Sequence, residues 1–453
     1  MSTTTDARQE SKLKRNLTFT NLMAIAIGQI IGAGIMTMTG TAIGMTGTGV
    51  ALAFMVSPIL TLITDFPQAI LGACAPVTGG PYKYITRLIG KKTGFLYITL
   101  FIITSSTLSL YALSFSSYFV SIFTGLNEIF IAATILTVLF IVNIVGTKQA
   151  AIVNTLICVV MIGAILAFAA FGLPKADYPY IFESSNLFMY GKMNFLSALA
   201  LLSFATGGAS VIAQLGGEAK NPSRDIPLVM IVSTLIVGLM YVGVALVATG
   251  VLPIDVVADQ NLTLVAREIL PTPIYYVFVI GAALGATSST LNAQLSWVSK
   301  PIVVACDDGM LPRSLASVNL NGIPWKILTI FYVLGMLPIL TGFDISFISK
   351  LSTAISLLTK VITVLALYRL ADKYPKKVAE SKLKVPVKWF KPWSIIATIV
   401  SIILAYSLIW NMDISSKILV LVLIVASVLY SFVGLKNVTI PDDLDIDYTS
   451  NSN

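Results

Sequence analysis

The hydrophobic positions of this chain gather into twelve long apolar runs, which are separated by shorter polar segments. A helix needs about 20 mainly apolar residues to cross the hydrocarbon core of a bilayer, and the runs meet that requirement. The runs cover residues 19–45, 49–74, 93–123, 128–145, 150–173, 194–217, 226–251, 272–300, 326–342, 344–370, 392–411 and 415–435. The pattern therefore predicts an all-α integral membrane protein with twelve transmembrane helices.

The composition agrees with this class of protein and excludes others. Of the 453 residues, 56% are hydrophobic and 11% are charged, against about 25% charged residues in ordinary soluble domains. The formal net charge is +8, but the location of the basic residues along the spans is more telling than their sum, so we expect no nucleic-acid partner. The chain has no histidine, and its three cysteines lack the spacing of a metal site. We therefore predict no cofactor, no metal and no enzymatic activity.

The basic residues indicate how the chain is oriented. Twelve helices place both termini on one side, and most Lys and Arg residues fall in segments on that side. The opposite loops hold only Lys175, Lys192, Arg267 and Lys417. Because basic loops tend to stay in the cytoplasm, we expect a multi-pass protein of the cell (cytoplasmic) membrane, with a cytoplasmic arm at 1–18 and a cytoplasmic tail at 436–453.

Two spans carry a glycine break in the middle, at residues 31–35 and 205–210. Unwound helix is tolerated inside a bilayer only where it is buried in protein or lines a polar cavity, so paired breaks indicate the binding site of a transporter. The breaks open the first five spans, at 19–173, and the next five, at 194–370. An odd number of helices turns the second unit over, which predicts a five-plus-five inverted repeat, with the spans at 392–435 outside it.

Four short motifs follow one another along the chain. They are Gln29-x-x-Gly32-Ala33-Gly34-Ile35 in the first helix, Pro76-Val77-Thr78-Gly79-Gly80-Pro81-Tyr82-x-Tyr84 after the second, Glu218-Ala219-Lys220-Asn221-Pro222-Ser223-Arg224-Asp225-Ile226-Pro227 after the sixth, and Asp307-Asp308-Gly309-Met310-Leu311-Pro312 after the eighth. Together they resemble the motifs of the amino acid-polyamine-organocation (APC) transporters. The resemblance implies a LeuT-like fold with helices one and six broken, and transport of amino acids or amines by alternating access.

The two breaks suit the two charged groups of an amino acid. Backbone N–H groups at the first break lie at the positive end of the following half-helix and would hold the carboxylate. Freed carbonyls before the second break would hold the ammonium. The substrate-binding candidates at the breaks are Ile31, Gly32, Ala33, Gly34, Phe204, Ala205, Thr206 and Gly207. The competing interpretation is that these glycines serve only close helix packing.

The resemblance also implies contacts with the side chain of the substrate. By register against relatives, Ser105 and Leu108 of the third helix and Gln294 of the eighth face that side chain, and Phe204 matches an aromatic that caps the substrate. Serine in a membrane helix also bonds the carbonyl of the preceding turn, and Phe204 is equally compatible with a core or lipid contact. Ser210 stands where relatives that carry cationic substrates have glutamate, and its hydroxyl cannot balance a second positive charge. We therefore expect a small, neutral amino acid.

Ionisable and hydroxyl residues inside the spans are candidates for coupling. Asp65 in the second helix and Lys360 in the tenth would both lie in the inner half of the membrane, where a pair between them would be functional or purely structural. Ser288 and Ser289 belong to a hydroxyl cluster that would supply oxygen ligands to sodium or serve ordinary packing. The lysine that fills the sodium position in helix five of some relatives is absent. Exchange, proton symport and sodium symport therefore remain open.

The favoured interpretation is a secondary active transporter that moves a small neutral amino acid by exchange or proton-coupled symport. The nearest alternative is an antiporter that exchanges an amino acid for its decarboxylation product, an amine. A non-transporting membrane sensor on the same fold is disfavoured, because the polar segments leave no room for an output domain. Membrane lipid is the remaining expected partner.

Overall fold

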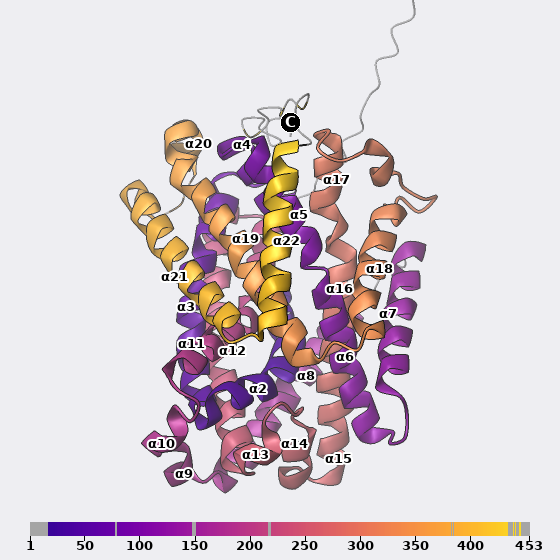
Figure 1. The fold of residues 1–453 in the computed structure, drawn as a ribbon. Helices are drawn as coiled ribbons and strands as arrows, with labels where there is room; N and C mark the ends of the chain where they lie inside the picture. Colours follow the sequence, from indigo (N-terminus) through magenta and orange to yellow (C-terminus); the bar gives the residue numbers. More distant parts are fainter. Residues whose placement is uncertain are drawn as a thin grey trace, which may run out of the picture.

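The computed structural model of the chain is a bundle of α-helices (Figure 1). It describes residues 17–77, 79–146, 151–215, 219–381, 383, 385–433, 438, 440 and 444. Most of the predicted N-terminal arm and tail lie outside these residues, as do Thr78 and Glu218 of the motifs. Within the described part there is no β-strand, and a lone β-bridge joins Leu17 to Ala219. The prediction of an all-α fold is confirmed.

The first half of the described chain matches the first five apolar runs. Its helices are α1 (Phe19–Ile30), α2 (Ala33–Thr46), the short 3₁₀ turn η1 (Gly47–Gly49), α3 (Val50–Cys74), α4 (Gly80–Leu88), α5 (Lys91–Ile103), α6 (Ser106–Ile122), α7 (Glu128–Val145) and α8 (Ala151–Gly172). Asn127 caps α7, because its side-chain oxygen accepts a hydrogen bond from the N–H of Phe130 at 3.1 Å. Such a cap satisfies one of the N–H groups that a helix leaves free at its start.

The second half continues the pattern. Its main elements are α11 (Lys192–Ala205), the 3₁₀-helix η3 (Gly207–Leu215), α12 (Pro222–Gly250), α15 (Thr272–Tyr276), the π-helical η4 (Val277–Leu284), α16 (Gly285–Trp297), α17 (Ser299–Asp307), α18 (Trp325–Leu340), α19 (Ile345–Lys373), α21 (Phe390–Trp410) and α22 (Ile414–Val433). Short helices connect them, among them α9 (Tyr178–Phe182), α10 (Ser184–Leu187), α13 (Ile254–Val257), α14 (Thr263–Ile269) and α20 (Pro375–Glu380).

Ten segments of the described chain are long and apolar enough to cross a membrane. One of them, Phe19–Cys74, contains two of the predicted runs, and the shorter apolar helix Trp325–Leu340 corresponds to another. The chain is thus a multi-pass membrane protein, and the count of twelve spans stays a prediction.

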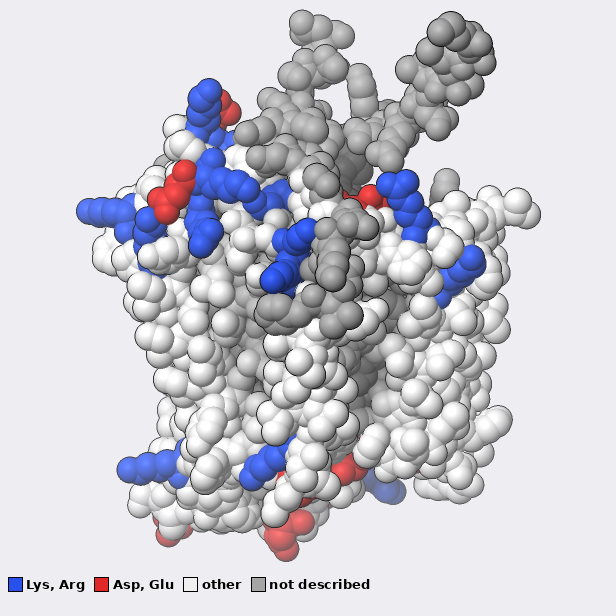
Figure 2. All heavy atoms as spheres, turned by 45° about the horizontal axis from the view of Figure 1, so that its top comes forward, with Lys and Arg blue, Asp and Glu red and all other residues white. Residues whose placement is uncertain are grey.

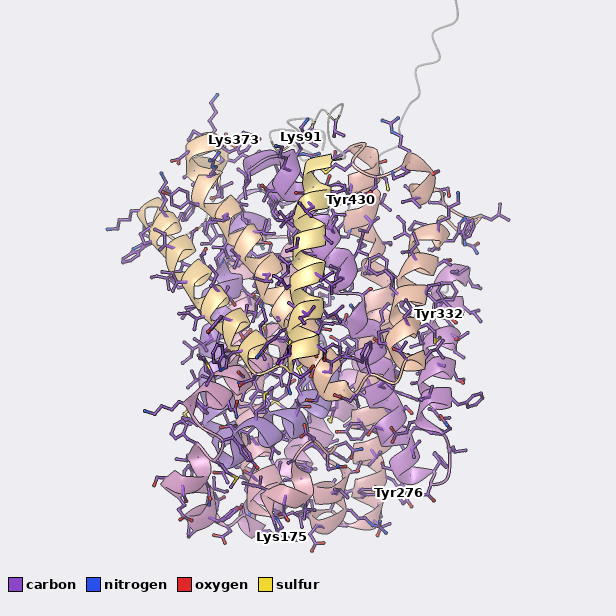
Figure 3. All side chains as sticks on the ribbon, viewed as in Figure 1. Lys91, Lys175, Tyr276, Tyr332, Lys373 and Tyr430 are labelled. Carbon is purple, nitrogen blue, oxygen red and sulfur yellow. The ribbon has the colours of Figure 1, made fainter. Side chains whose placement is uncertain are left out.

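Charged side chains concentrate at the two ends of the bundle, and a belt almost free of charge separates them on the face shown in Figure 2. The helices α4, α17 and α20 lie at one end, called here the α4 end, and α9, α10 and α13 lie at the other, the α9 end (Figure 1). Lys91 and Lys373, which the sequence assigns to the cytoplasm, lie at the α4 end, whereas Lys175 lies at the α9 end (Figure 3). This separation is the one that the predicted orientation requires.

The two broken helices pack against each other at their breaks. α1 packs against η3, and α2 packs against α11. A Cβ on Gly34 would lie 2.9 Å from the Cα of Ala205, and a Cβ on Gly208 would overlap the carbonyl oxygen of Gln29. Only glycine allows the backbones to approach this closely. The glycines at these positions therefore serve close helix packing, and this packing is compatible with a binding role.

The predicted third helix, 93–123, is interrupted at Thr104 between α5 and α6. Thr104 Oγ1 donates to the carbonyl of Phe101 at 2.6 Å, and Thr107 Oγ1 donates to the carbonyl of Thr104 at 2.7 Å. Hydroxyl groups that bond the preceding turn compete with the backbone and bend membrane helices. The apolar pattern alone does not reveal this interruption, because the run continues through it.

Candidate functional site

The first break leaves the beginning of α2 uncapped. Ile31 and Gly32 depart from helical geometry, with φ −75°, ψ 62° and φ −111°, ψ −149°. α2 begins at Ala33, and no side chain caps its first turn. The leading N–H groups of a helix have no partner within the helix, and they carry the positive end of its dipole. The beginning of α2 therefore suits a carboxylate.

The second break presents the opposite polarity. α11 ends at Ala205, and Thr206 follows with φ −95°, ψ −2° before η3 begins. Ser210 Oγ donates to the carbonyl of Gly207 at 3.1 Å, so this hydroxyl is engaged by the backbone. The final carbonyls of a helix carry the negative end of its dipole. The end of α11 therefore suits an ammonium group.

A cavity of about 220 Å³ lies at the two breaks and is completed by α5, α6, α16 and α19. Small-molecule sites for drug-sized ligands usually exceed about 300 Å³, so this cavity fits a small solute. The substrate-binding and coupling candidates that line it are Gly34, Phe204, Ala205, Gly207, Gln294 and Lys360, and Ser210 lines it as well. Ile31, Gly32 and Thr206 lie within the breaks but do not line the cavity. The side chain of Ala33 is outside the described part of the chain.

The predicted third helix meets the cavity with a different face from the one expected. The cavity-lining residues at its interruption and beyond are Thr104, Thr107 and Tyr111. Ser105 and Leu108 do not line the cavity. Leu108 packs instead against α18, where a Cβ on Gly335 would lie 2.9 Å from the Cβ of Leu108.

Three aromatic side chains that the sequence analysis did not single out form one wall of the cavity. They are Tyr97, Phe101 and Trp297. The ring centroids of Tyr97 and Phe101 are 5.9 Å apart, and those of Phe101 and Trp297 are 6.0 Å apart. Tyr97 and Phe101 lie four residues apart on α5, a spacing that places them on one helix face and could have drawn attention to them. The amide of Gln294, which donates to Thr107 Oγ1, adds a polar group to this mainly apolar surface.

Asp65 and Lys360 form an ion pair beside the second break. Lys360 Nζ lies 2.6 Å from Asp65 Oδ1, and the two side chains are 17% and 3% exposed, respectively. A Cβ on Gly207 would lie 3.5 Å from Asp65 Oδ2 and 3.6 Å from Lys360 Nζ. Lys360 lines the cavity, whereas Asp65 does not. The tertiary structure thus brings together two charges that lie far apart in the sequence.

The hydroxyl cluster on α16 bonds mainly to its own helix. Ser288 Oγ donates to the carbonyl of Leu284 at 2.6 Å, and Thr287 Oγ1 donates to the carbonyl of Ala283 at 2.8 Å. Neither Ser288 nor Ser289 lines the cavity.

The cavity extends toward the α4 end, where Pro81 of α4 contributes to its lining.

At the α9 end, hydrogen bonds tie a connecting loop to the helices. Tyr118 OH donates to the carbonyl of Met36 at 2.8 Å, and it accepts from the N–H of Leu262 at 3.2 Å. These bonds join α2, α6 and the loop between α13 and α14.

Comparisons with known proteins agree with these features. The amino acid permease family matches the chain over residues 17–430. The chain is similar to the branched-chain amino acid permease of Bacillus subtilis (strain 168), with 28% identity over 334 residues, 68% of this chain and 71% of that protein. It shares 30% identity with the serine/threonine exchanger of the same organism, over 58% of this chain and 61% of that protein. It shares 25% identity with cationic amino acid transporter 1 of Arabidopsis thaliana, over 69% of this chain and 55% of that protein.

Proposed function

Because the chain belongs to the amino acid permease family, whose members are transporters and not enzymes, we propose that it carries a small neutral amino acid across the cytoplasmic membrane by alternating access. The observation that carries this proposal is the cavity at the two helix breaks, where the beginning of α2 packs against the end of α11. Two helix ends of opposite polarity beside one small cavity match the two charges of a zwitterion.

In the proposed complex, backbone groups hold the part of the substrate that all amino acids share. The N–H groups at residues 32–34 bind the carboxylate, and the carbonyls of residues 204–206 bind the ammonium. Phe204 lines the cavity next to the second break and would cap the substrate. The substrate side chain would then lie against the aromatic wall and the polar group of Gln294.

Two observations support a neutral substrate. Two relatives from Bacillus subtilis are named for branched-chain amino acids and for serine and threonine, all of which have neutral side chains. Ser210 offers a hydroxyl that already donates to the carbonyl of Gly207, and so it cannot balance a second positive charge.

The proposed architecture has twelve spans in a LeuT-like arrangement of two five-helix repeats. The packing of α1 against η3 and of α2 against α11 supports it, since inverted repeats cross their broken helices in this manner. The helices that follow the two breaks, α3 and α12, also pack along each other. The basic α4 end would face the cytoplasm, together with both termini.

For coupling, we favour exchange or proton symport. Asp65 Oδ2 is buried and has no hydrogen-bond partner within the described part of the chain, so it is a group that could accept a proton. A sodium site at Ser288 and Ser289 has less support, because neither residue lines the cavity at the two breaks.

The test is uptake of radiolabelled amino acids by the purified protein in proteoliposomes. We expect saturable uptake of at least one small neutral amino acid, and thermal stabilisation of the detergent-solubilised protein by the same compound, because a ligand of the folded state raises its stability. Preloading the vesicles with unlabelled substrate would accelerate uptake by an exchanger, whereas an inward proton gradient would drive uptake by a symporter. Absence of saturable uptake for every amino acid and amine would refute the proposal.

A further inference from the structure

One side chain gives the cavity its charge. Among the described residues that line it, Lys360 is the only Lys, Arg, Asp or Glu. Its ammonium lies beside Gly207, at the same break whose carbonyls would hold the ammonium of the substrate. The remaining lining residues are apolar, aromatic, hydroxyl or amide groups.

We propose that Lys360 acts as a charge filter, a tethered ammonium that excludes substrates with a cationic side chain. The proposal rests on the proposed function, since it presumes that an amino acid binds in this cavity. It adds a specificity-determining pair, Lys360 and Asp65, to the backbone groups that bind the shared part of every amino acid.

The geometry of the pair explains the exclusion. A cationic side chain inside a membrane protein needs a carboxylate partner. Asp65 is the acid at this site, but its Oδ1 is held by Lys360 at 2.6 Å and its side chain is only 3% exposed. An incoming second ammonium would therefore meet the charge of Lys360 before it could reach the carboxylate. Because Lys360 lines the cavity and Asp65 does not, a second ammonium lies nearer the like charge than the carboxylate, and we expect the net repulsion to weaken binding by about tenfold.

The same geometry explains why a neutral zwitterion is accepted. Asp65 balances the charge of Lys360, so the pair as a whole adds no net charge to the cavity. The α-ammonium of the substrate is compensated by the carbonyls at the end of α11. A side-chain ammonium has no such partner, because no carboxylate is among the described residues that line the cavity. Removal of the lysine alone would reverse the selectivity, because it would leave a carboxylate next to the cavity.

The experiment compares two probes of the same chain length that differ in charge, L-2,4-diaminobutyrate and L-homoserine. Each is tested as an inhibitor of uptake of the amino acid that the wild-type protein transports. We expect homoserine to inhibit wild-type uptake at a concentration at least about tenfold lower than diaminobutyrate. In Lys360→Gln this ratio should fall by about 10- to 100-fold, because the carboxylate of Asp65 becomes available to the second ammonium.

Two further variants keep the test decisive if Lys360→Gln does not fold. Lys360→Arg preserves the positive charge and should preserve the wild-type ratio. The double variant D65N/K360Q carries no charge at this site, and its ratio should fall between those of the other two. Thermal unfolding in detergent identifies any variant that is misfolded.

Two outcomes would overturn the filter. They are equal inhibition of the wild type by both probes, or a wild-type ratio retained in both Lys360→Gln and D65N/K360Q. Each of these can occur while the wild type still transports its amino acid. Failure of the filter is thus distinct from failure of the proposed function, which would appear as no saturable uptake at all.

Discussion

Replacement of Asp308 by alanine should lower the thermal stability of the protein, because it removes the partner of a buried guanidinium group. Arg87 donates through Nη1 to Asp308 Oδ2 at 2.6 Å and through Nη2 to Oδ1 at 2.9 Å. The two side chains are only 1% and 5% exposed. Tyr82 OH donates to the same Oδ2 at 2.8 Å. Burial and the neighbouring carboxylate raise the pKa of Tyr82, which keeps the hydroxyl protonated as a donor.

The size of the expected loss of stability follows from the burial of the Arg87–Asp308 pair. Removing one partner of a buried ion pair costs about 3–5 kcal/mol, since an uncompensated charge remains in the interior. An unfolding entropy of about 2.1 cal/mol/K per residue corresponds to about 1 kcal/mol per degree for a chain of this length. We therefore expect Asp308→Ala to lower the unfolding temperature by about 3–5 °C. The double variant R87M/D308A should lose less than the sum of the two single variants, because it leaves no buried charge.

The assay is thermal unfolding of the detergent-solubilised protein, followed by tryptophan fluorescence. An exposed pair at the same end of the bundle provides the control. Lys391 Nζ lies 2.8 Å from Asp372 Oδ2, and these side chains are 46% and 60% exposed. Asp372→Ala should change the unfolding temperature by less than about 1 °C. The reasoning is refuted if Asp308→Ala behaves like this control, or if the losses from R87M and D308A simply add.

Two further predictions concern packing and pH. A Cβ on Gly32 would overlap Thr290 Oγ1 and lie 3.4 Å from Thr290 Cβ. Gly32→Ala should therefore lower the free energy of unfolding by about 1–3 kcal/mol, and by less in a Thr290→Ala background. Equal losses of stability in both backgrounds would contradict the contact. Hydrogen bonds from Ser415 and Ser416 lower the pKa of Asp413, which caps α22. A carboxylate whose pKa is lowered in the folded state stabilises the fold above about pH 4, and this stabilisation is lost as the pH falls further. Asp413→Ala should therefore unfold at a lower temperature than the wild type at pH 7, and the difference in unfolding temperature should shrink below about pH 4. A difference that does not depend on pH would argue against the cap.

The sequence predicted the elements of the fold well, because each span must satisfy a simple physical requirement. Helices that meet lipid need a long apolar run, and the runs at 49–74, 128–145 and 344–370 correspond closely to α3, α7 and α19. The family, inferred from four motifs, is confirmed by the match over residues 17–430. The interruption at Thr104 escaped prediction, since hydroxyl groups that bond the backbone leave the hydropathy of a span almost unchanged.

The sequence by itself determined that this chain crosses a membrane many times, that two of its helices break at glycines, and that charges at the breaks must come mainly from the backbone. These properties follow from local chemistry, namely apolar length, glycine content and the scarcity of ionisable residues. Only the tertiary structure decided which residues share the cavity. Asp65 and Lys360 are nearly 300 positions apart, and their pairing at 2.6 Å depends on how α3 packs against α19. The face that α6 presents, with Thr107 in the cavity and Leu108 against α18, likewise depends on how α6 packs against its neighbours.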